Sequence, residues 1–155
     1  MLTTPVKKYI LAKLGGGLST SGSIYLENGV YLGLSSTTPN ADGTNFTEPN
    51  SGGYARIRIS GSSSSSGPVY PFVWTSQSGT DAYTQVQNQF EIHFNVATAD
   101  WGNPITHVGI FDASGRLMAY GHLVDSQGQE TSITVLNGHI PTISAGQAKI
   151  SLDIQ

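Results

Sequence analysis

The chain has 155 residues, a formal net charge of −3 and only 11% charged residues. Its seven Lys and Arg residues form no basic stripe that would neutralise a phosphate backbone, which argues against nucleic-acid binding. The absence of cysteine excludes disulfides and thiolate metal sites. No apolar run is long enough to cross a bilayer, and the N-terminus lacks the pattern of a signal peptide. We therefore expect one domain over residues 1–155, made and used in a cytoplasm or assembled there and released.

The N-terminal segment, residues 1–17, predicts a short helix. Pro5 suits the first helical position, and Tyr9 and Ile10 lie on an apolar stripe. Three glycines at 15–17 would end the helix. Such a helix could pack on its own domain or dock on a neighbouring subunit.

The remainder, residues 18–155, consists of short apolar stretches separated by turn residues. In 29–35 the apolar residues alternate, so Val30, Leu32 and Leu34 are expected to face the core. Further strands are predicted at 24–27, 54–60, 69–74, 86–96, 105–111, 117–123, 131–136 and 148–154, with long loops at 36–53 and 60–68. This spacing favours an all-β fold, an antiparallel β-sandwich of the jelly-roll kind with a short N-terminal helix.

The segments 105–111 and 117–123 are predicted to pair as a hairpin. Gly115 suits the left-handed position of its loop, and Asp112 is expected to bond nearby backbone amides. His107 and His122 lie on opposite arms and could approach each other. Whether they do depends on the register of the hairpin, since a slip of one residue would separate them. Two histidines without a third ligand are a weak zinc signal, so we expect a surface or hydrogen-bonded pair.

Nothing in the chain indicates a reaction centre. The acids are scattered, and Asp100 beside Trp101 is expected to be a turn or cap residue. No serine occupies a nucleophile elbow, and the glycines at 15–17 lack the lysine of a phosphate loop. We therefore predict no catalytic residue, no cofactor and no metal site, and we expect that the protein is not an enzyme.

Two sets of residues are candidates for a partner interface. Tyr70, Phe72 and Trp74 alternate on an extended stretch and would lie on one side of it. They are expected in a core or subunit interface, with contact to sugar rings as the alternative. The second set is Tyr9, Ile10 and Lys13 of the N-terminal segment, together with the loop 37–50.

Several segments, taken in order, resemble a family of tailed-phage virion proteins described as head-fibre, capsid-decoration or tail-fibre-like proteins. They are Tyr-Leu-Gly-Leu-Ser-Ser-Thr-Thr-Pro at 31–39, Ser-Gly-Gly-Tyr-Ala-Arg at 51–56, Phe-Asn-Val-Ala-Thr-Ala-Asp-Trp-Gly at 94–102, Thr-His-Val-Gly-Ile-Phe-Asp at 106–112 and Leu-Met-Ala-Tyr-Gly-His-Leu at 117–123. The serine-rich stretch 61–73 departs from the pattern, and residues 137–155 match it loosely.

The resemblance implies a structural protein of the virion, assembled in the cytoplasm of the host bacterium. The expected role is decoration or stabilisation of the capsid exterior, or the base of a head fibre. The expected partners are other copies of the chain, as a trimer, and the major capsid protein or another virion protein, without nucleic acid or membrane. The alternative is a tail or baseplate protein that binds a receptor or carbohydrate. A polysaccharide depolymerase would need an organised acid pair.

Overall fold

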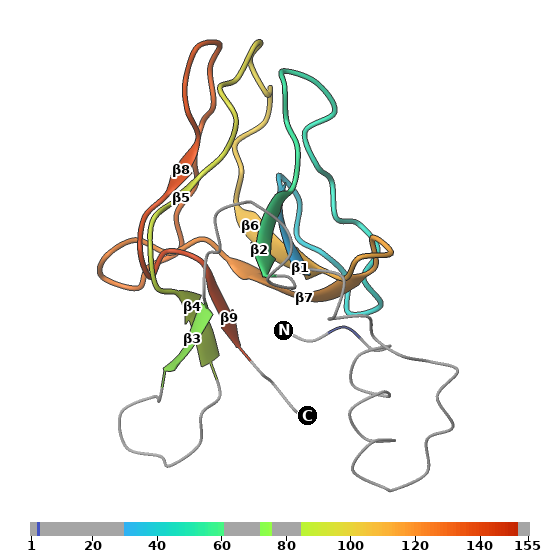
Figure 1. Ribbon diagram of the computed structural model, residues 1–155, viewed down its shortest axis with the longest axis vertical. Coiled ribbons are helices and arrows are strands. Elements are labelled where there is room, and N and C mark those ends of the chain that lie inside the picture. The colour runs from blue at the N-terminus through green and yellow to red at the C-terminus, as the bar shows by residue number, and fades with distance from the viewer. Residues whose placement is uncertain (1–2, 4–29, 61–71, 76–84, 152–155) are drawn as a thin grey trace, which may run out of the picture.

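The computed structural model describes residues 3, 30–60, 72–75 and 85–151 (Figure 1). These ranges contain strands and no helix, so the all-β prediction is confirmed for them. The strands are β1 (Val30–Ser35), β2 (Ile57–Ser60), β3 (Phe72–Thr75), β4 (Gln85–Asn88), β5 (Ile92–His93), β6 (His107–Phe111), β7 (Leu117–His122), β8 (Thr142–Ile143) and β9 (Lys149–Ser151). Most of the predicted helical segment 1–17 and the predicted strand 24–27 lie outside the described residues.

The described strands form three antiparallel sheets, with orders β2-β1-β6-β7, β3-β4-β9 and β5-β8. A bridge between Leu123 and Ala148 connects the end of β7 to the start of β9 and so joins the first two sheets. The antiparallel class is thus confirmed. The jelly-roll-like sandwich is not established by these three small sheets and stays a prediction.

Both faces of β1 are covered. Leu32 and Leu34 are buried in the main core, as their alternation predicts, and Val30 packs against it. On the other face Tyr31 packs on a second apolar cluster that contains Phe111. Removal of apolar surface from water on both sides makes this sheet the stable centre of the described structure.

Two glycines permit close approach between elements of this sheet and their neighbours. A Cβ atom on Gly121 would overlap the backbone carbonyl of Lys149 in β9. A Cβ atom on Gly109 would overlap the ring of Phe46 and a methyl group of Leu117. Only a residue without a side chain fits either position at the observed spacing.

The prediction of one strand over 86–96 is wrong, because the chain turns after β4. The buried Asn88 side chain donates from Nδ2 to the carbonyls of Phe90 (2.8 Å) and Ser144 (2.9 Å). These bonds hold a bend after β4, so Phe90 is 56% exposed and does not share the buried face of Ile92 and Phe94.

The predicted strand 131–136 is also absent as a strand. Only Ile133 pairs there, in an isolated bridge with Ile105, and the residues that follow form a loop. The chain regains regular pairing at β8, which the sequence pattern did not indicate. A strand of two residues is too short to show an alternation of apolar and polar side chains, so it cannot be recognised from the sequence pattern.

Candidate functional site

The structure describes only part of the two predicted interface sets. Tyr9, Ile10, Lys13 and Tyr70 lie outside the described residues. Phe72 and Trp74 lie in β3, where Phe72 pairs with Asn88 and Trp74 with Val86. Their predicted role in a core or subunit interface stays a prediction.

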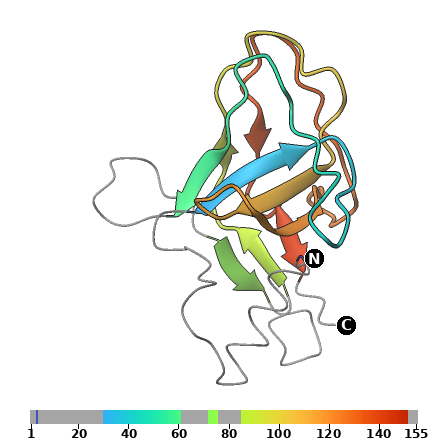
Figure 2. The same cartoon turned by 90° about the vertical axis from the view of Figure 1, so that its right-hand side faces the viewer.

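Three long connections rise together to one end of the molecule, which we call the apical tip (Figures 1 and 2). The tip consists of residues 50–53 between β1 and β2, residues 95–104 between β5 and β6, and residues 134–141 between β7 and β8. None of these stretches contains a strand. The tip therefore depends on contacts between loops rather than on a sheet.

Backbone hydrogen bonds tie the three loops to one another. Thr98 N donates to the Gly52 carbonyl (3.0 Å), Ala97 N to that of His139 (2.8 Å) and Trp101 N to that of Val135 (3.0 Å). The Trp101 indole is buried and donates to the Gly52 carbonyl at 3.2 Å. Asp100, predicted as a turn or cap residue, accepts from Asn137 N at 2.7 Å and so links two of the loops.

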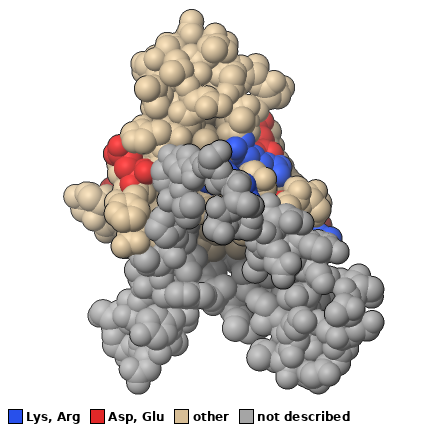
Figure 3. Space-filling view, in the orientation of Figure 1, with Lys and Arg blue, Asp and Glu red and all other residues tan. Residues whose placement is uncertain are grey.

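The tip exposes apolar side chains. Among the described residues, the large apolar side chains that are strongly exposed are Phe90, Val96 (50%), Leu136 (45%) and Ile140 (54%). Three of these four belong to the tip, whose only Lys, Arg, Asp or Glu residue is Asp100. On the face shown in Figure 3 the upper part of the molecule displays neither acidic nor basic side chains. Rigid loops that expose apolar groups on a scaffold are typical of an interaction surface.

The loop 37–50 was predicted to be long and exposed, and most of its residues are exposed. Its second half is nevertheless held in place by contacts of its side chains with residues in and beside the sheet. Glu48 forms an ion pair with Arg56 (2.7 Å) and accepts from the Tyr54 hydroxyl at 2.6 Å. The Arg56 guanidinium lies 3.4 Å from the centroid of Phe111, whose ring also meets Phe46 edge-on.

The Tyr54 hydroxyl joins this cluster to the interior of the sheet. It accepts from Leu34 N (2.9 Å) while donating to Glu48. Burial and the hydrogen bond to Glu48 raise the pKa of the Tyr54 phenol, so it stays protonated and remains a donor. The loop is therefore a fixed part of the scaffold near β1.

The register of the β6–β7 hairpin, left open by the sequence, brings His107 and His122 together. They are directly opposed in the β6–β7 pairing, and their ring centroids are 3.9 Å apart. His107 is 2% exposed, and its Nε2 has no hydrogen-bond partner within the described residues. Burial and the adjacent His122 lower the pKa of His107 to about 4, so the ring is neutral at pH 7.

The acids in organised regions serve local structure. Asp112 Oδ1 accepts from Ser114 N (3.0 Å) and Arg116 N (2.9 Å), which confirms the predicted turn role. Asp125 makes the same kind of turn with Gln127 N and Gln129 N.

Within the ranges the structure describes, no group of three or more His, Cys, Asp or Glu is placed to hold a metal ion. The same ranges contain no helix long and apolar enough to span a membrane.

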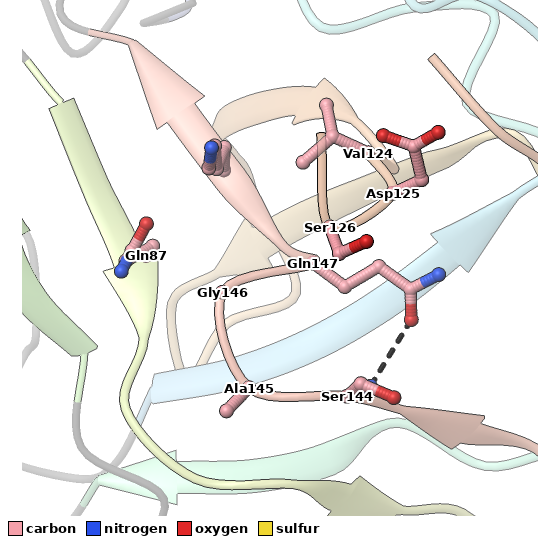
Figure 4. Close-up of a pocket in the computed structure, with 9 residues that line it drawn as sticks. Gln87, Val124, Asp125, Ser126, Ser144, Ala145, Gly146 and Gln147 are labelled. Atoms are coloured by element: carbon pink, nitrogen blue, oxygen red, sulfur yellow. Dashed lines mark hydrogen bonds between the residues drawn. The ribbon is translucent and has the colours of Figure 1, made fainter. Parts of the chain in front are cut away.

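A polar pocket of about 540 Å³ lies where β4, β9 and two turns meet (Figure 4). Asp125 and Ser126 form one rim, Ser144 and Gly146 another, and Gln87 lies on a third side. This pocket was not predicted, because its walls come from three separate segments of the chain, Gln87, 124–126 and 144–149.

The exposed residues of the tip were not predicted either. The one local signal for them was the Asn137-Gly138 turn directly after the apolar Val135 and Leu136.

The family model for podophage GP4 fiber I protein gp80 matches residues 18–151 of the chain. The chain belongs to this family. It is therefore a fibre protein of a tailed phage and a structural component of the virion, as the resemblance implied. A comparison with curated proteins found no match to the chain.

The match of the GP4 fiber I family takes in every described strand, the apical tip and the polar pocket. Residues 1–17, which contain Tyr9, Ile10 and Lys13, lie before the matched region. The matched region thus covers the described β-structure and begins after residues 1–17.

Proposed function

We propose that this fibre protein lies on the outer surface of the capsid, where it forms or anchors a head fibre through non-covalent contacts and catalyses no reaction. The family match over residues 18–151 carries the proposal, because it identifies a fibre protein. In the proposal the chain assembles as a homotrimer and binds the major capsid protein or another virion protein. Repetition of one modest contact over a shell multiplies its effect on the whole particle.

The apical tip is the described surface best suited to contact a protein of the particle. Val96, Leu136 and Ile140 are already exposed there, so burying them against a partner requires no unfolding. The loops are fixed by their mutual hydrogen bonds, so little conformational entropy is lost on binding. The near absence of charge means that few ionic groups must be desolvated.

The second proposed contact with the particle consists of Tyr9, Ile10 and Lys13. The proposed interface between subunits consists of Tyr70, Phe72 and Trp74. These roles separate experimentally. Triple substitution of Tyr9, Ile10 and Lys13 by serine should weaken particle binding and leave the oligomeric state unchanged, whereas Trp74→Ala should weaken the trimer. Analytical ultracentrifugation of the purified chain and co-sedimentation with particles lacking the protein measure the two effects.

Gold-labelled antibody on intact particles tests the location. We expect gold on the head. Gold confined to the tail or baseplate would favour the alternative placement, and particles without gold would contradict a virion role.

A second experiment tests the proposal that the protein catalyses no reaction. The purified protein is incubated with host capsule or envelope polysaccharide, and release of reducing ends would contradict this part of the proposal.

A further inference from the structure

We infer that the polar pocket between β4, β9 and the turns 124–129 and 144–147 is a binding site for an uncharged saccharide unit. This goes beyond the proposed structural function and does not depend on it. The inference rests on the unused hydrogen-bonding groups that line the pocket, on the rigidity of its rims and on its balance of charge.

On every side of the pocket, polar side chains have hydrogen-bond donors or acceptors that no described residue uses. Asp125 uses only Oδ1 for its turn, which leaves Oδ2 as an acceptor. Gln147 uses only Oε1, which accepts from Ser144 N at 3.0 Å, so its Nε2 remains a donor (Figure 4). The side chains of Gln87, Ser126 and Lys149 have no hydrogen-bond or ion-pair partner among the described residues.

The rims are fixed before any ligand arrives. Asn88 is 1% exposed, and its side chain accepts from Ala148 N (3.0 Å) while donating to the Ser144 carbonyl (2.9 Å). Val124 N donates to the Gln147 carbonyl at 2.9 Å, which ties one rim to the other. The backbone of both rims is therefore in place before a ligand enters, and only the side chains without partners have to be ordered on binding.

The side chains of the pocket define the class of ligand. One carboxylate and one ammonium line it, Asp125 and Lys149, and no ion pair joins them. The pocket therefore carries no net charge that would favour an anion or a cation. Sugar hydroxyls both donate and accept, which matches a wall of amides, hydroxyls, one carboxylate and one ammonium. Hydrogen bonds from hydroxyls to these two charged groups would be the strongest in the complex.

The volume agrees with this class of ligand. A pocket of about 540 Å³ lies within the range of roughly 300–1,000 Å³ found for small-molecule sites. Val124 and Ala145 supply a small apolar patch for the C–H face of a sugar ring. No aromatic ring is among the residues that line the pocket, so recognition would depend on hydrogen bonds rather than on stacking.

The test uses the full-length protein, fluorescently labelled, on an array of neutral, acidic and amino saccharides. We expect binding to at least one neutral saccharide, then confirmed by NMR titration with that sugar. Asp125→Asn keeps the Oδ1 acceptor of the turn but removes the carboxylate, and Lys149→Met removes only the charged end of a long side chain. Each should weaken binding at least tenfold, the loss expected for one charge-assisted hydrogen bond.

Asp42→Asn is the matched control, because Asp42 also accepts from a turn amide, Thr44 N, but does not line the pocket. It should bind as the wild type does. Gln87→Ala provides a further variant that leaves both turns untouched, and equal urea midpoints show that the variants fold. The inference is overturned if no neutral saccharide binds, if only acidic saccharides or free amino acids bind, or if binding survives all the pocket substitutions. Particle incorporation, measured separately, should be unchanged in these variants.

Discussion

The sheet β2-β1-β6-β7 and the apical tip are stabilised in different ways. The sheet is covered on both faces, by the main core on one side and by the Phe111 cluster on the other. The tip has no regular strand, is tied together by bonds between loops and leaves Val96, Leu136 and Ile140 in solvent. Substitutions in the sheet should therefore change the stability of the fold, whereas substitutions at the tip should change association with partners.

The largest effect is expected at Gly121. In Gly121→Ala the new methyl group would collide with the Lys149 carbonyl, a backbone group that cannot rotate away. We expect the free energy of unfolding to fall by about 3 kcal/mol, the upper range for overpacking, as measured by urea denaturation. Gly138→Ala is the control at the tip, because nothing lies within 4 Å of a Cβ there and only the positive φ of 83° opposes it. Equal losses in both variants would contradict the distinction between the two regions.

The next effect depends on pH and concerns His107. Its pKa is about 4 in the folded protein and 6.5 as a free side chain, so the unfolded state binds more protons between these pH values. Stability should therefore fall as the pH drops from about 6.5 to 4, by up to about 3 kcal/mol from this group.

His107→Gln cannot titrate, so it isolates this contribution. We expect the wild type to lose about 2 to 3 kcal/mol more than His107→Gln between pH 7.5 and pH 4.5 in urea titrations. His93→Gln, at an exposed histidine, is the matched control. The same acid loss in wild type and His107→Gln would show that the buried ring is not responsible.

A smaller effect is expected at Glu48. Glu48→Ala removes the partner of Arg56 and of the Tyr54 hydroxyl, both part-buried, and should cost about 2 kcal/mol of unfolding free energy. The matched control is Glu91→Ala, since Glu91 pairs with His93 at the surface, where such a pair contributes about 0.5 kcal/mol or less. A Glu48→Ala variant as stable as Glu91→Ala would mean that the loop 37–50 is not fixed as described.

The smallest effect on stability is expected at the tip. Leu136→Asp and Ile140→Asp place a charge on side chains that are about half exposed, so unfolding free energy should change by about 0.5 kcal/mol or less. Co-sedimentation with particles lacking the protein should nevertheless fall at least tenfold, because the charge would be buried without a partner. Thr134→Asp, at an exposed tip residue that is not apolar, tests whether charge alone disrupts binding. Full binding of the first two variants would remove the tip from the proposed interface.

The sequence predicted what depends on short-range chemistry. The β6–β7 hairpin and the turn role of Asp112 both follow from local patterns, and the structure confirms them. The register of the hairpin, which decides whether His107 and His122 are opposed, was left open by the sequence. The inward orientation of Leu32 and Leu34 also follows from their alternation. In each case the determining residues lie within one strand pair or one turn.

Features that depend on distant segments were not predictable. The bend after β4 arises because Asn88 bonds to Ser144, far along the chain, and so Phe90 points to solvent despite its apolar period. Leu136 belongs to an apparent strand pattern, yet no element covers it. The polar pocket forms only where three separate segments of the chain meet. Alternation identifies side chains that share a face, but it carries no information on what covers that face.

An electron-microscopy map of the intact particle tests the central claim most directly. We predict density for this chain on the outer surface of the head, in copies related by three-fold symmetry, with Val96, Leu136 and Ile140 buried against a neighbouring protein. Density only at the tail, or a chain absent from the purified particle, would contradict the account.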